Sequence, residues 1–580
     1  MKRTPLLAAI ALLSATSHAK TWLLPIPQSV EWTGYQLQLD PDFSIEGATN
    51  LFVHEAAQRY HKLITKERWI PYQKNITEIT PLKTRKDTLK TLLISVQDDH
   101  AKLDFGIDEA YNLTIPDNGG KATLDAVTWV GALRGLETFS QVIIEDDGTL
   151  VAHSSKIQDE PTYPHRGIML DTSRNFYSVE SILRTLDAMA YSKLNVFHWH
   201  ITDSQSWPLH LEKHPELAQK GAYSSSQIYT TADMHRIVQH AQSRGIRVIP
   251  EIDMPSHTAS IAKSHPDLVA CVNKNWEMYG AEPAPGALDP TKNETYALIE
   301  DIVSELADIF PDSFFHAGGD EVNSHCWADD KTIGPYMKKH GLTTDQLWAQ
   351  FEDKVGNIVE QNNKRAMIWE DAIVVAKADL SKSKYPLITM FLIYLHAVNQ
   401  SYNKPNIDVA VQVWTTTPED IIKLGHDIIH SSSDYFYLDC GSGGWVQDDH
   451  RYISPDQKAT PGDTFNYGGT GGSWCAPYKT WQRIYSFDMT KGIKKQSGHG
   501  QVLGGEVALW SEQSDETVLD AKLWPRASAA AEVFWSGSYD MNGKRRELGE
   551  VWPRMNDWRF RLLKRGIGAS KCWLVRCVFQ

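Results

Sequence analysis

The sequence lacks a long apolar segment beyond its N-terminal region. The apolar run from Leu6 to Leu13 is far shorter than the roughly 20 residues that a membrane-spanning helix needs. It follows Lys2 and Arg3 and precedes Ser17-His18-Ala19, which is the pattern of a secretory signal with a cleavage site. We therefore expect residues 1–19 to be a signal peptide, and the mature protein to be secreted without a membrane partner.

The sequence also lacks an excess of positive charge. It contains 58 Lys and Arg residues against 72 Asp and Glu residues, which gives a formal net charge of −14 at pH 7. Nucleic acids and anionic membranes attract basic surfaces. The charge balance therefore argues against either as a partner.

Cysteines are few, and none of them forms a CxxC pair. The six stand at Cys271, Cys326, Cys440, Cys475, Cys572 and Cys577. Without a CxxC pair a zinc ribbon is not expected, whereas an even number of cysteines outside the cytosol favours disulfides, with several connectivities open. Four N-x-S/T sequons are candidate glycosylation sites, at Asn75, Asn112, Asn293 and Asn399.

The chain of 580 residues is too long for one ordinary domain, but fits a large barrel with a smaller domain. Residues 20–161 mix alternating apolar stretches, such as Thr91 to Val96, with the helical patterns of Leu51 to Leu63 and Val127 to Val142. No catalytic constellation occurs in this region. We expect it to form a small α+β domain.

From Tyr163 onward, strand, loop and helix patterns alternate. Eight apolar runs are candidate strands, and they begin at Arg166, Asn195, Arg247, Ser313, Ala366, Val409, Ile428 and Gly505. Amphipathic segments such as Ser178 to Met189 and Asn293 to Phe310 separate them, and Thr517 to Trp535 is expected to be a last long helix. This pattern predicts an α/β fold in which residues 162–580 form a (β/α)8 TIM barrel.

Nearly every predicted strand ends in an acid, a histidine or a tryptophan. These residues are Asp171, His200, Asp203, Asp253, Glu321, Glu370, Asp371, Trp414, Asp439, Trp510 and Glu512. Any one of them would also fit a helix cap or a surface charge. Because barrels of this kind carry their active sites at the C-terminal strand ends, their repetition predicts one shared site.

The segment from Ser313 to Trp327 holds the sharpest pattern. Gly318 and Gly319 permit a tight bend after a buried strand, and Asp320 and Glu321 follow at once. Along a straight strand these two carboxyls would point to opposite faces, but at a bend both can enter one pocket. Two carboxyls in one dry pocket cannot both ionise freely, so one of them is expected to hold a proton. The alternative interpretation is a pair of acids in a solvated loop.

Two further features favour a carbohydrate ligand. The chain contains 20 tryptophans, which can fill a core but whose faces also stack on sugar rings. The Gly-rich stretch from Cys440 to Cys475 is too long for an ordinary loop and is expected to be a binding loop or lid. Trp445 and Trp474 lie on it and can either pack or stack on sugar.

Seven motifs in order along the chain resemble glycoside hydrolase family 20, the β-N-acetylhexosaminidases, and look closest to the secreted fungal enzymes. They are HRGIMLDTSRNF, FHWHITDSQSWP, PEIDMPSH, HAGGDEVN, IWED, YFYLD and GGEVALWSE. The resemblance implies an exo-acting enzyme that removes terminal N-acetylglucosamine, with N-acetylgalactosamine as a second candidate, from chitooligosaccharides or glycoconjugates. It also implies a retaining mechanism in which the substrate's acetamido oxygen attacks the anomeric carbon.

The resemblance assigns roles to particular residues. Glu321 would be the general acid and base, Asp320 would hold the acetamido N–H, and Tyr437 would donate to the acetamido oxygen. The remaining residues implied are pocket walls (Trp369, Trp414, Trp510), ligands of ring hydroxyls (Arg166, Asp439, Glu512) and a pair that steers the proton (Asp203, His257). The implied disulfides are Cys271–Cys326, Cys440–Cys475 and Cys572–Cys577. No metal or other cofactor is expected, and a homodimer is retained as a candidate assembly.

A metal-dependent, amidohydrolase-type barrel enzyme is the alternative. His198 and His200 end one predicted strand, and His257, His316 and Asp203 complete a set of imidazole and carboxylate groups that suits a metal. This alternative offers no role for the aromatic residues at the strand ends.

Overall fold

The structure is a computed structural model that describes residues 22–72, 83–378, 409–415, 417–442, 475, 477–493 and 499–572. Several sequence predictions fall outside these ranges, namely the signal peptide, the sequons at Asn75 and Asn399, Trp445, Trp474 and Cys577. Among the described residues, no helix combines the length and the apolar character needed to cross a membrane.

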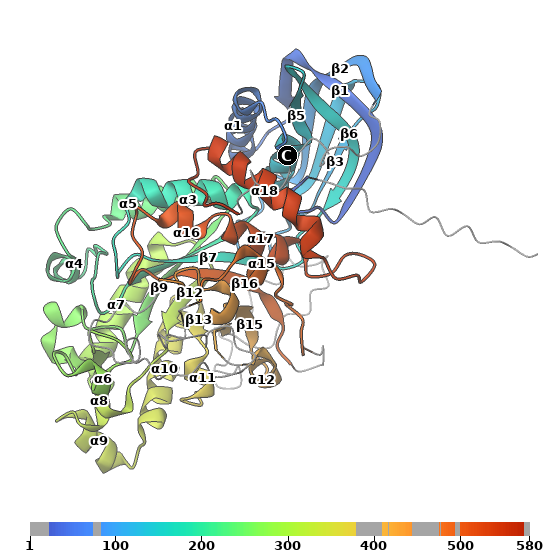
Figure 1. Cartoon of the computed structure of the whole chain (residues 1–580). Coiled ribbons are helices and arrows are strands. Elements are labelled where there is room, and N and C mark those ends of the chain that lie inside the picture. Colours follow the sequence, from blue (N-terminus) through green and yellow to red (C-terminus); the bar gives the residue numbers. More distant parts are fainter. Residues whose placement is uncertain are drawn as a thin grey trace, which may run out of the picture.

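The first part of the chain folds into a mixed six-stranded sheet with two helices (Figure 1). The strands follow the order β1 (Ser29–Glu46), β2 (Lys83–Asp98), β4 (Gly120–Thr128), β3 (Tyr111–Ile115), β6 (Thr149–Asp159) and β5 (Ile143–Asp146). Helix α1 (Leu51–Glu67) begins after Asn50, whose side chain accepts from the N–H groups of Phe52 and Val53. Helix α2 (Trp129–Val142) is capped by Thr128, and all its residues are buried. The predicted α+β architecture is confirmed.

The second part is a closed barrel of eight parallel strands, as predicted. In spatial order these are β7 (His165–Asp171), β8 (Val196–Thr202), β9 (Arg247–Met254), β12 (Phe314–Gly318), β13 (Arg365–Trp369), β14 (Ala410–Val413), β15 (Asp427–His430) and β16 (Val502–Leu509). All of these strands are buried along nearly their whole length, which explains why each reads as an apolar run.

Helices surround the barrel, and shorter ones lie within the segments that connect its strands (Figure 1). The longer ones are α3 (Val179–Tyr191), α5 (Thr231–Gln242), α7 (Asn293–Ile309), α9 (Ile333–His340), α10 (Thr344–Gln361), α17 (Arg526–Ser536) and α18 (Leu548–Lys564). The short ones are α4 (Pro215–Gly221), α6 (Trp276–Tyr279), α8 (Ser324–Ala328), α11 (Asp371–Val374), α12 (Pro418–Lys423), α13 (Ser433–Phe436), α15 (Trp481–Tyr485) and α16 (Leu519–Leu523). Two single-turn 3₁₀ helices (Ile261–Lys263, Pro266–Leu268) and a small ladder of β10 (Val269–Ala270) with β11 (Ala287–Leu288) follow β9.

Two predicted elements are wrong in extent. The seventh strand ends at His430 instead of continuing to Asp439, because the chain turns into α13 before Tyr437 pairs with Ala508. The predicted helix from Thr517 to Trp535 is divided into α16 and α17 by Pro525, which has no N–H to donate and cannot sit inside a helix without strain.

The barrel interior is layered. Near the N-terminal strand ends lies an apolar cluster of Val196, Ile249, Phe314, Met367, Ala410, Ile429 and Leu503. Two residues further along these strands, the buried side chains are polar and include His198, Glu251, His316 and Gln412. Residues two apart on a strand share a face, so this polar layer supports the barrel mouth directly.

The two parts of the chain are joined by a buried charge cluster. Glu109 accepts from Arg134 Nε at 2.8 Å and from Arg166 Nη2 at 2.7 Å, and all three side chains are at most 2% exposed. Arg166 lies at the N-terminal end of β7, and the length of the strand separates it by roughly 16 Å from Asp171 at the mouth. The prediction that Arg166 binds ring hydroxyls is wrong, because its guanidinium faces the first domain.

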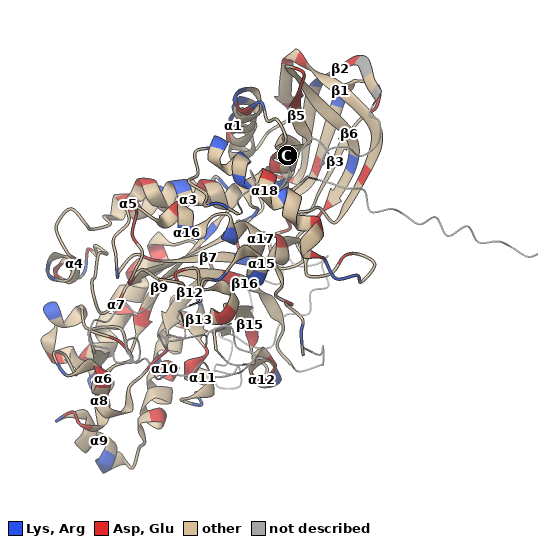
Figure 2. Ribbon diagram, in the orientation of Figure 1, with Lys and Arg blue, Asp and Glu red and all other residues tan. Residues whose placement is uncertain are grey.

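Helix α18 also ties the two parts together. Its Arg561 and Arg565 pair with Glu67 of α1 at 3.2 and 3.0 Å, and Arg565 pairs with Glu137 of α2 at 2.9 Å. Figure 2 shows both basic and acidic positions on this helix. Trp535 of α17 adds an apolar contact to the core of the first domain.

Replacing Glu109 by Gln is expected to lower the free energy of unfolding by about 3–5 kcal/mol, because it leaves two buried guanidinium groups without their carboxylate. Denaturant unfolding of the purified protein measures this loss. The control is Glu145→Gln, which breaks a pair with Arg68 whose side chain is 42% exposed, and it should cost under about 1 kcal/mol. Equal losses in the two variants would contradict the assignment.

Candidate active site

The strand ends bring most of the predicted residues to one mouth. Those present are Asp203, His257, Asp320, Glu321, Trp369, Trp414, Tyr437, Asp439, Trp510 and Glu512. Tyr437 and Asp439 arrive from the segment after α13 instead of from a strand. The structure thus brings these residues to the C-terminal strand ends, whereas Arg166, which the resemblance assigned to the site, lies elsewhere.

The bend after β12 positions the two adjacent acids. Gly318 and Gly319 have φ angles of 69° and 98°, and a Cβ at Gly318 would lie 1.8 Å from the Asp253 Oδ1 atom. Only glycine fits there. Glu321 itself has a φ of 54°, so the strand alternation is broken at this residue. Both carboxyls consequently approach His257, with Nε2 at 3.9 Å from Asp320 and 3.3 Å from Glu321.

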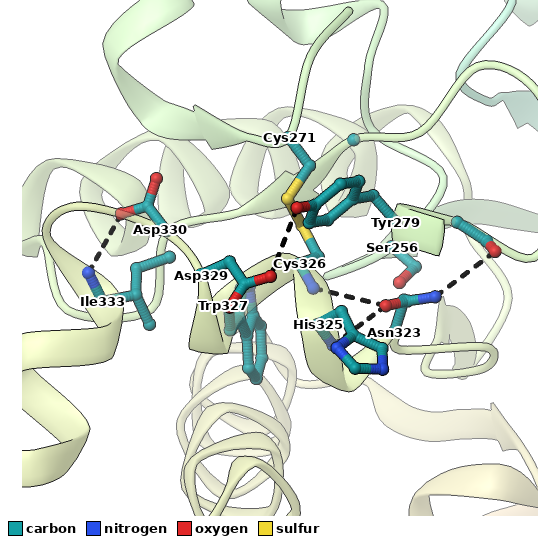
Figure 3. Close-up of a disulfide and its surroundings, with 12 residues drawn as sticks. Ser256, Cys271, Tyr279, Asn323, His325, Cys326, Trp327, Asp329, Asp330 and Ile333 are labelled. Atoms are coloured by element: carbon teal, nitrogen blue, oxygen red, sulfur yellow. Dashed lines mark hydrogen bonds between the residues drawn. A yellow bond between two sulfur atoms is a disulfide. The ribbon is translucent and has the colours of Figure 1, made fainter. Parts of the chain in front are cut away.

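The segment after Glu321 is held in place by a cap and a disulfide (Figure 3). Asn323 Oδ1 accepts from the N–H groups of His325 at 3.0 Å and Cys326 at 3.2 Å, which starts α8. Its Nδ2 donates to the Gly280 carbonyl at 3.3 Å. The Cys271–Cys326 disulfide then links α8 to the segment that follows β9.

Two of the three implied disulfides are present. Besides Cys271–Cys326, a Cys440–Cys475 bridge packs against the aromatic residues of the mouth. Cys577 lies outside the described residues, so its pairing with Cys572 stays a prediction. Of the described sequons, Asn112 on β3 and Asn293 at the start of α7 are both exposed.

The two adjacent acids differ in burial. The Asp320 side chain is 11% exposed, whereas that of Glu321 is 31% exposed. Burial raises the pKa of Asp320 well above its ordinary value, and the nearby Asp253 carboxyl raises it further, against the opposing effect of His257. The more buried Asp320 is therefore the acid that holds a proton in the open pocket. Its Oδ1 atom is buried without a hydrogen-bond partner, so the pocket leaves one acceptor to be satisfied.

A chain of paired groups leads from Glu321 into the barrel. His257 Nδ1 lies 3.2 Å from Asp203 Oδ1, and His200 Nε2 lies 3.1 Å from Asp203 Oδ2. Burial opposes a charge on His257, but Asp203 and Asp253 hold its pKa well above the ordinary value. Although burial also opposes the charge on Asp203, Arg174 and His257 bring its pKa well below its usual range. The chain therefore begins with a cationic imidazole beside Glu321.

Glu251 is the buried end of this chain. It faces His200 Nδ1 at 2.7 Å and His198 Nε2 at 2.9 Å, and it accepts from the indole N–H of Trp369 at 2.8 Å. His316 Nδ1 lies 3.1 Å away as a fourth neighbour. Despite burial, the histidines lower the pKa of Glu251 well below its ordinary value. One carboxylate thus supports both the proton chain and a wall of the pocket.

These contacts bear on the metal-dependent alternative. The second nitrogen of His198 lies 2.7 Å from Glu506, so both nitrogens of His198 face carboxylates, as do both nitrogens of His200. The carboxylates raise the pKa of His198 to about 9 against the effect of burial, and that of His200 well above its ordinary value. A protonated imidazole has no lone pair for a metal. His198 and His200 are therefore structural ion-pair partners.

Aromatic side chains enclose the space beside Asp320. The ring centroids of Trp369 and Trp510 are 5.7 Å apart, those of Tyr437 and Trp510 are 6.1 Å apart, and Trp414 stacks on Tyr437 at 6.3 Å. The indole N–H of Trp414 donates to Asp371 at 2.8 Å. These four aromatic side chains therefore form one cluster at the mouth.

Sequence reasoning missed Arg174. Its Nη1 lies 2.9 Å from Asp203, its Nη2 pairs with Glu282, and the guanidinium stands 5.2 Å over Trp510. Glu512 also lies within its electrostatic reach. The signal was present, because Arg174 follows the C-terminal end of β7 whereas Arg166 lies at its start.

Several carboxyls of the mouth hold their protons unusually strongly. Burial, the largest cause in each case, raises the pKa of Asp253 to about 7 and those of Asp371 and Asp439 to about 6. Glu282 lies on a loop and not at a predicted strand end, and burial raises its pKa as well. The mouth thus concentrates more acids than its cations can neutralise.

The melting temperature is expected to fall by roughly 5 °C between pH 6.5 and pH 8. In this window Asp253, with a pKa of about 7, and His198, with a pKa of about 9, bind protons in the folded state that the unfolded chain has released. Their stabilising contribution is present at the lower pH and is lost as the pH rises through these values. A thermal unfolding series at fixed salt measures the fall.

Asp253→Asn should make this decline shallower, because the amide does not titrate. Asp488→Asn is the control: the hydroxyl of Tyr539 helps to lower the pKa of Asp488 against burial, so this group stays ionised throughout the window. A melting temperature that is constant or rises from pH 6.5 to pH 8 would refute the assignment.

Comparison with known proteins agrees with this site. A family model described as glycosyl hydrolase family 20, catalytic domain, matches residues 163–538, and one described as beta-acetyl hexosaminidase like matches residues 23–142. The chain is 37% identical to beta-hexosaminidase 1 of the fungus Coccidioides posadasii, over 97% of this chain and 95% of that protein. It is 36% identical to a chitooligosaccharidolytic beta-N-acetylglucosaminidase of Ostrinia furnacalis, over 90% of this chain and 82% of that protein.

A solved structure shows the same architecture. The X-ray structure of Flavobacterium johnsoniae chitobiase aligns with a TM-score of 0.72 at 25% identity, covering 95% of this chain and 73% of that one. The resemblance seen in the seven sequence motifs, including that to fungal enzymes, is confirmed by these matches. With a catalytic-domain model over more than half of its length and relatives aligned along nearly all of it, the chain belongs to glycosyl hydrolase family 20.

Proposed function

We propose that this β-N-acetylhexosaminidase is an exo-acting, retaining enzyme in which the acetamido oxygen of the substrate is the nucleophile. The observation that carries the proposal is the bend at Gly318 and Gly319, which points Asp320 and Glu321 at one cationic histidine beside an aromatic enclosure. The four aromatic rings clustered beside these acids suit the apolar faces of one sugar ring.

The acetamido group is placed by Asp320, Tyr437 and the indole walls. The acetamido N–H donates to the Asp320 Oδ1 atom, which has no protein partner. The Tyr437 hydroxyl donates to the acetamido oxygen and orients it toward the anomeric carbon. The acetamido oxygen then forms a bond to C1 as the glycosidic bond breaks, which closes an oxazolinium ring. The negative charge of Asp320 stabilises the positive charge of this ion.

Glu321 carries the proton. It donates to the departing glycosidic oxygen and then takes a proton from the water that opens the oxazolinium ring, so configuration is retained. In the open pocket the proton is held on Asp320, and an incoming N–H donor lowers the pKa of that carboxyl. We infer that acetamide binding moves the proton to Glu321, with His257 3.3 Å from one acid and 3.9 Å from the other.

Arg174, Asp439 and Glu512 bind the hydroxyls of the sugar ring. Charged side chains in a dry pocket make strong and directional hydrogen bonds to hydroxyl groups. Arg174 takes the role that the sequence pattern gave to Arg166. Its position over Trp510 places it beside the enclosure that surrounds the sugar.

The natural substrate is proposed to be a chitooligosaccharide or a glycoconjugate that ends in N-acetylglucosamine, with N-acetylgalactosamine as a second sugar. The relative from Ostrinia furnacalis, named for chitooligosaccharides, supports this choice. We also propose that the protein is secreted, which its leader pattern and its two disulfides support. A homodimer stays a prediction.

A panel of aryl glycosides tests the function. The purified protein should hydrolyse the N-acetylglucosaminide, and the glucoside without an acetamide should react at least about 10³-fold more slowly, since it lacks the nucleophile. Glu321→Gln should lower the turnover rate by about 10²–10⁴-fold with little change in substrate affinity.

Asp320→Asn should weaken the binding of a thiazoline analogue of the intermediate, whereas Asp371→Asn, which changes an acid that supports Trp414, should weaken it less. Equal rates on the glucoside and the N-acetylglucosaminide would exclude the mechanism. So would a covalent sugar ester trapped on the polypeptide.

Glu251 has a defined part in this mechanism although it does not reach the pocket. It fixes the indole of Trp369, and through His200 it fixes Asp203, which orients His257 against Glu321. Loss of its charge should therefore disturb both the enclosure and the proton path. Glu251 is a positioning residue.

Glu251→Gln is expected to lower the turnover rate by about 10²-fold and to shift the acidic limb of the pH–rate profile, because His200 and His257 lose support for their charge. The matched control is Glu352→Gln. Burial raises the pKa of Glu352 well above its ordinary value, so glutamine resembles its neutral form, which accepts from Trp348 at 3.0 Å. An unshifted profile in Glu251→Gln would contradict this role.

A further inference from the structure

A histidine and carboxylate cluster lies outside the pocket, on two loops at the same end of the barrel. It consists of His214, Glu216 and His265, and it is defined here as the His214 cluster. His214 lies in the loop after β8, directly before α4 at the periphery of the molecule (Figure 1), and His265 lies in the segment after β9. The three side chains are between 20% and 34% exposed, so small ions can reach them.

The distances within the His214 cluster match a tetrahedral metal site. His214 Nδ1 lies 3.2 Å from Glu216 Oε1, and His265 Nε2 lies 3.5 Å from the same oxygen. Bonds of 2.0–2.1 Å to zinc place two ligands of a tetrahedron about 3.3 Å apart. One potential ligand atom from each of the three residues lies within 4.8 Å of the other two. The fourth position faces solvent.

The outer nitrogen of each imidazole has its own partner. His214 Nε2 lies 3.2 Å from Asp301 Oδ2. His265 Nδ1 lies 2.9 Å from Ser264 Oγ, whose hydroxyl donates to the Ile261 carbonyl, so Nδ1 is the nitrogen that carries the proton. Outer partners of this kind fix the tautomer of metal-binding histidines.

The two inner nitrogens, His214 Nδ1 and His265 Nε2, face one oxygen of Glu216. When each imidazole carries its proton on the outer nitrogen, each inner nitrogen offers a lone pair, and a cation between these lone pairs and the carboxylate removes their repulsion. The outer contacts and the inner geometry thus point to the same occupant.

We propose that the His214 cluster is a zinc site with two imidazole ligands, one carboxylate ligand and one water. Two nitrogen ligands favour zinc or a similar transition metal over magnesium and calcium, which prefer oxygen. The ion ties the loop that carries Asp203 to the segment that carries His257. None of its ligands enters the pocket, so the ion stabilises these loops and takes no part in the chemistry.

Zinc binding to the tag-free, full-length protein, after chelation and dialysis, tests the proposal. Calorimetric titration with zinc chloride and elemental analysis should give one ion per chain, and zinc should raise the melting temperature. His214→Gln and His265→Gln should each abolish this binding. Asp301→Asn, which changes the outer partner of His214 but none of the proposed ligands, should weaken it by about 10–100-fold.

The control is His210→Gln on the same loop. His210 pairs with the Glu212 carboxylate at 3.5 Å and does not belong to the His214 cluster. Zinc binding should therefore be unchanged in this variant. Melting temperatures in the presence of chelator confirm that each variant folds. Absence of zinc binding to the wild-type protein at about 100 μM, or equal binding in His265→Gln, would overturn the site.

Discussion

The barrel mouth buries more carboxyls than its cations can neutralise, and this excess determines which of its acids are protonated. Asp203 and Glu251 stay ionised because Arg174 and the histidines surround them. For Asp253 and Asp320 the effect of burial outweighs that of the nearby His257, so these two acids hold their protons. A buried charge is expensive unless it is paired, so the folded state itself divides the acids into two protonation classes. This division exists before any ligand arrives, and in the proposed mechanism it supplies the proton that acetamide binding moves from Asp320 to Glu321.

At the opposite end of the barrel, the charges of the buried acids are compensated by ion pairs. There Glu109 and Asp159 of the first domain are fully paired, with Arg166 and Lys193 of the barrel among their partners. These groups have no acceptor or donor left for a ligand, so they join the domains and nothing more. At the mouth, in contrast, Asp320 keeps an unsatisfied oxygen. Glu109 and Asp159 are thus satisfied within the protein, whereas Asp320 retains an oxygen that a ligand can use.

The sequence predicted the barrel well because all its strands are buried and therefore appear as apolar runs. It predicted the bend at Gly318 for a local reason, since only glycine accepts that close approach. The sequence did hold the signal that distinguishes Arg174 from Arg166, since they lie at opposite ends of β7, but the resemblance of the shared motif led to Arg166. Glu251 was missed for another reason. Its partners lie on three different strands, β8, β12 and β13, and on no common sequence motif.

The connection through Glu251 also explains why the enclosure and the proton path belong together. Trp369 can close around an acetamido group only if its indole is fixed, and His257 can face Glu321 only if Asp203 is fixed. Both depend on one carboxylate whose charge is stabilised by the histidines around it. Protonating or removing that carboxylate would release the wall and the relay at once. In the proposed mechanism, substrate fit and proton delivery are therefore coupled through buried groups of the barrel interior.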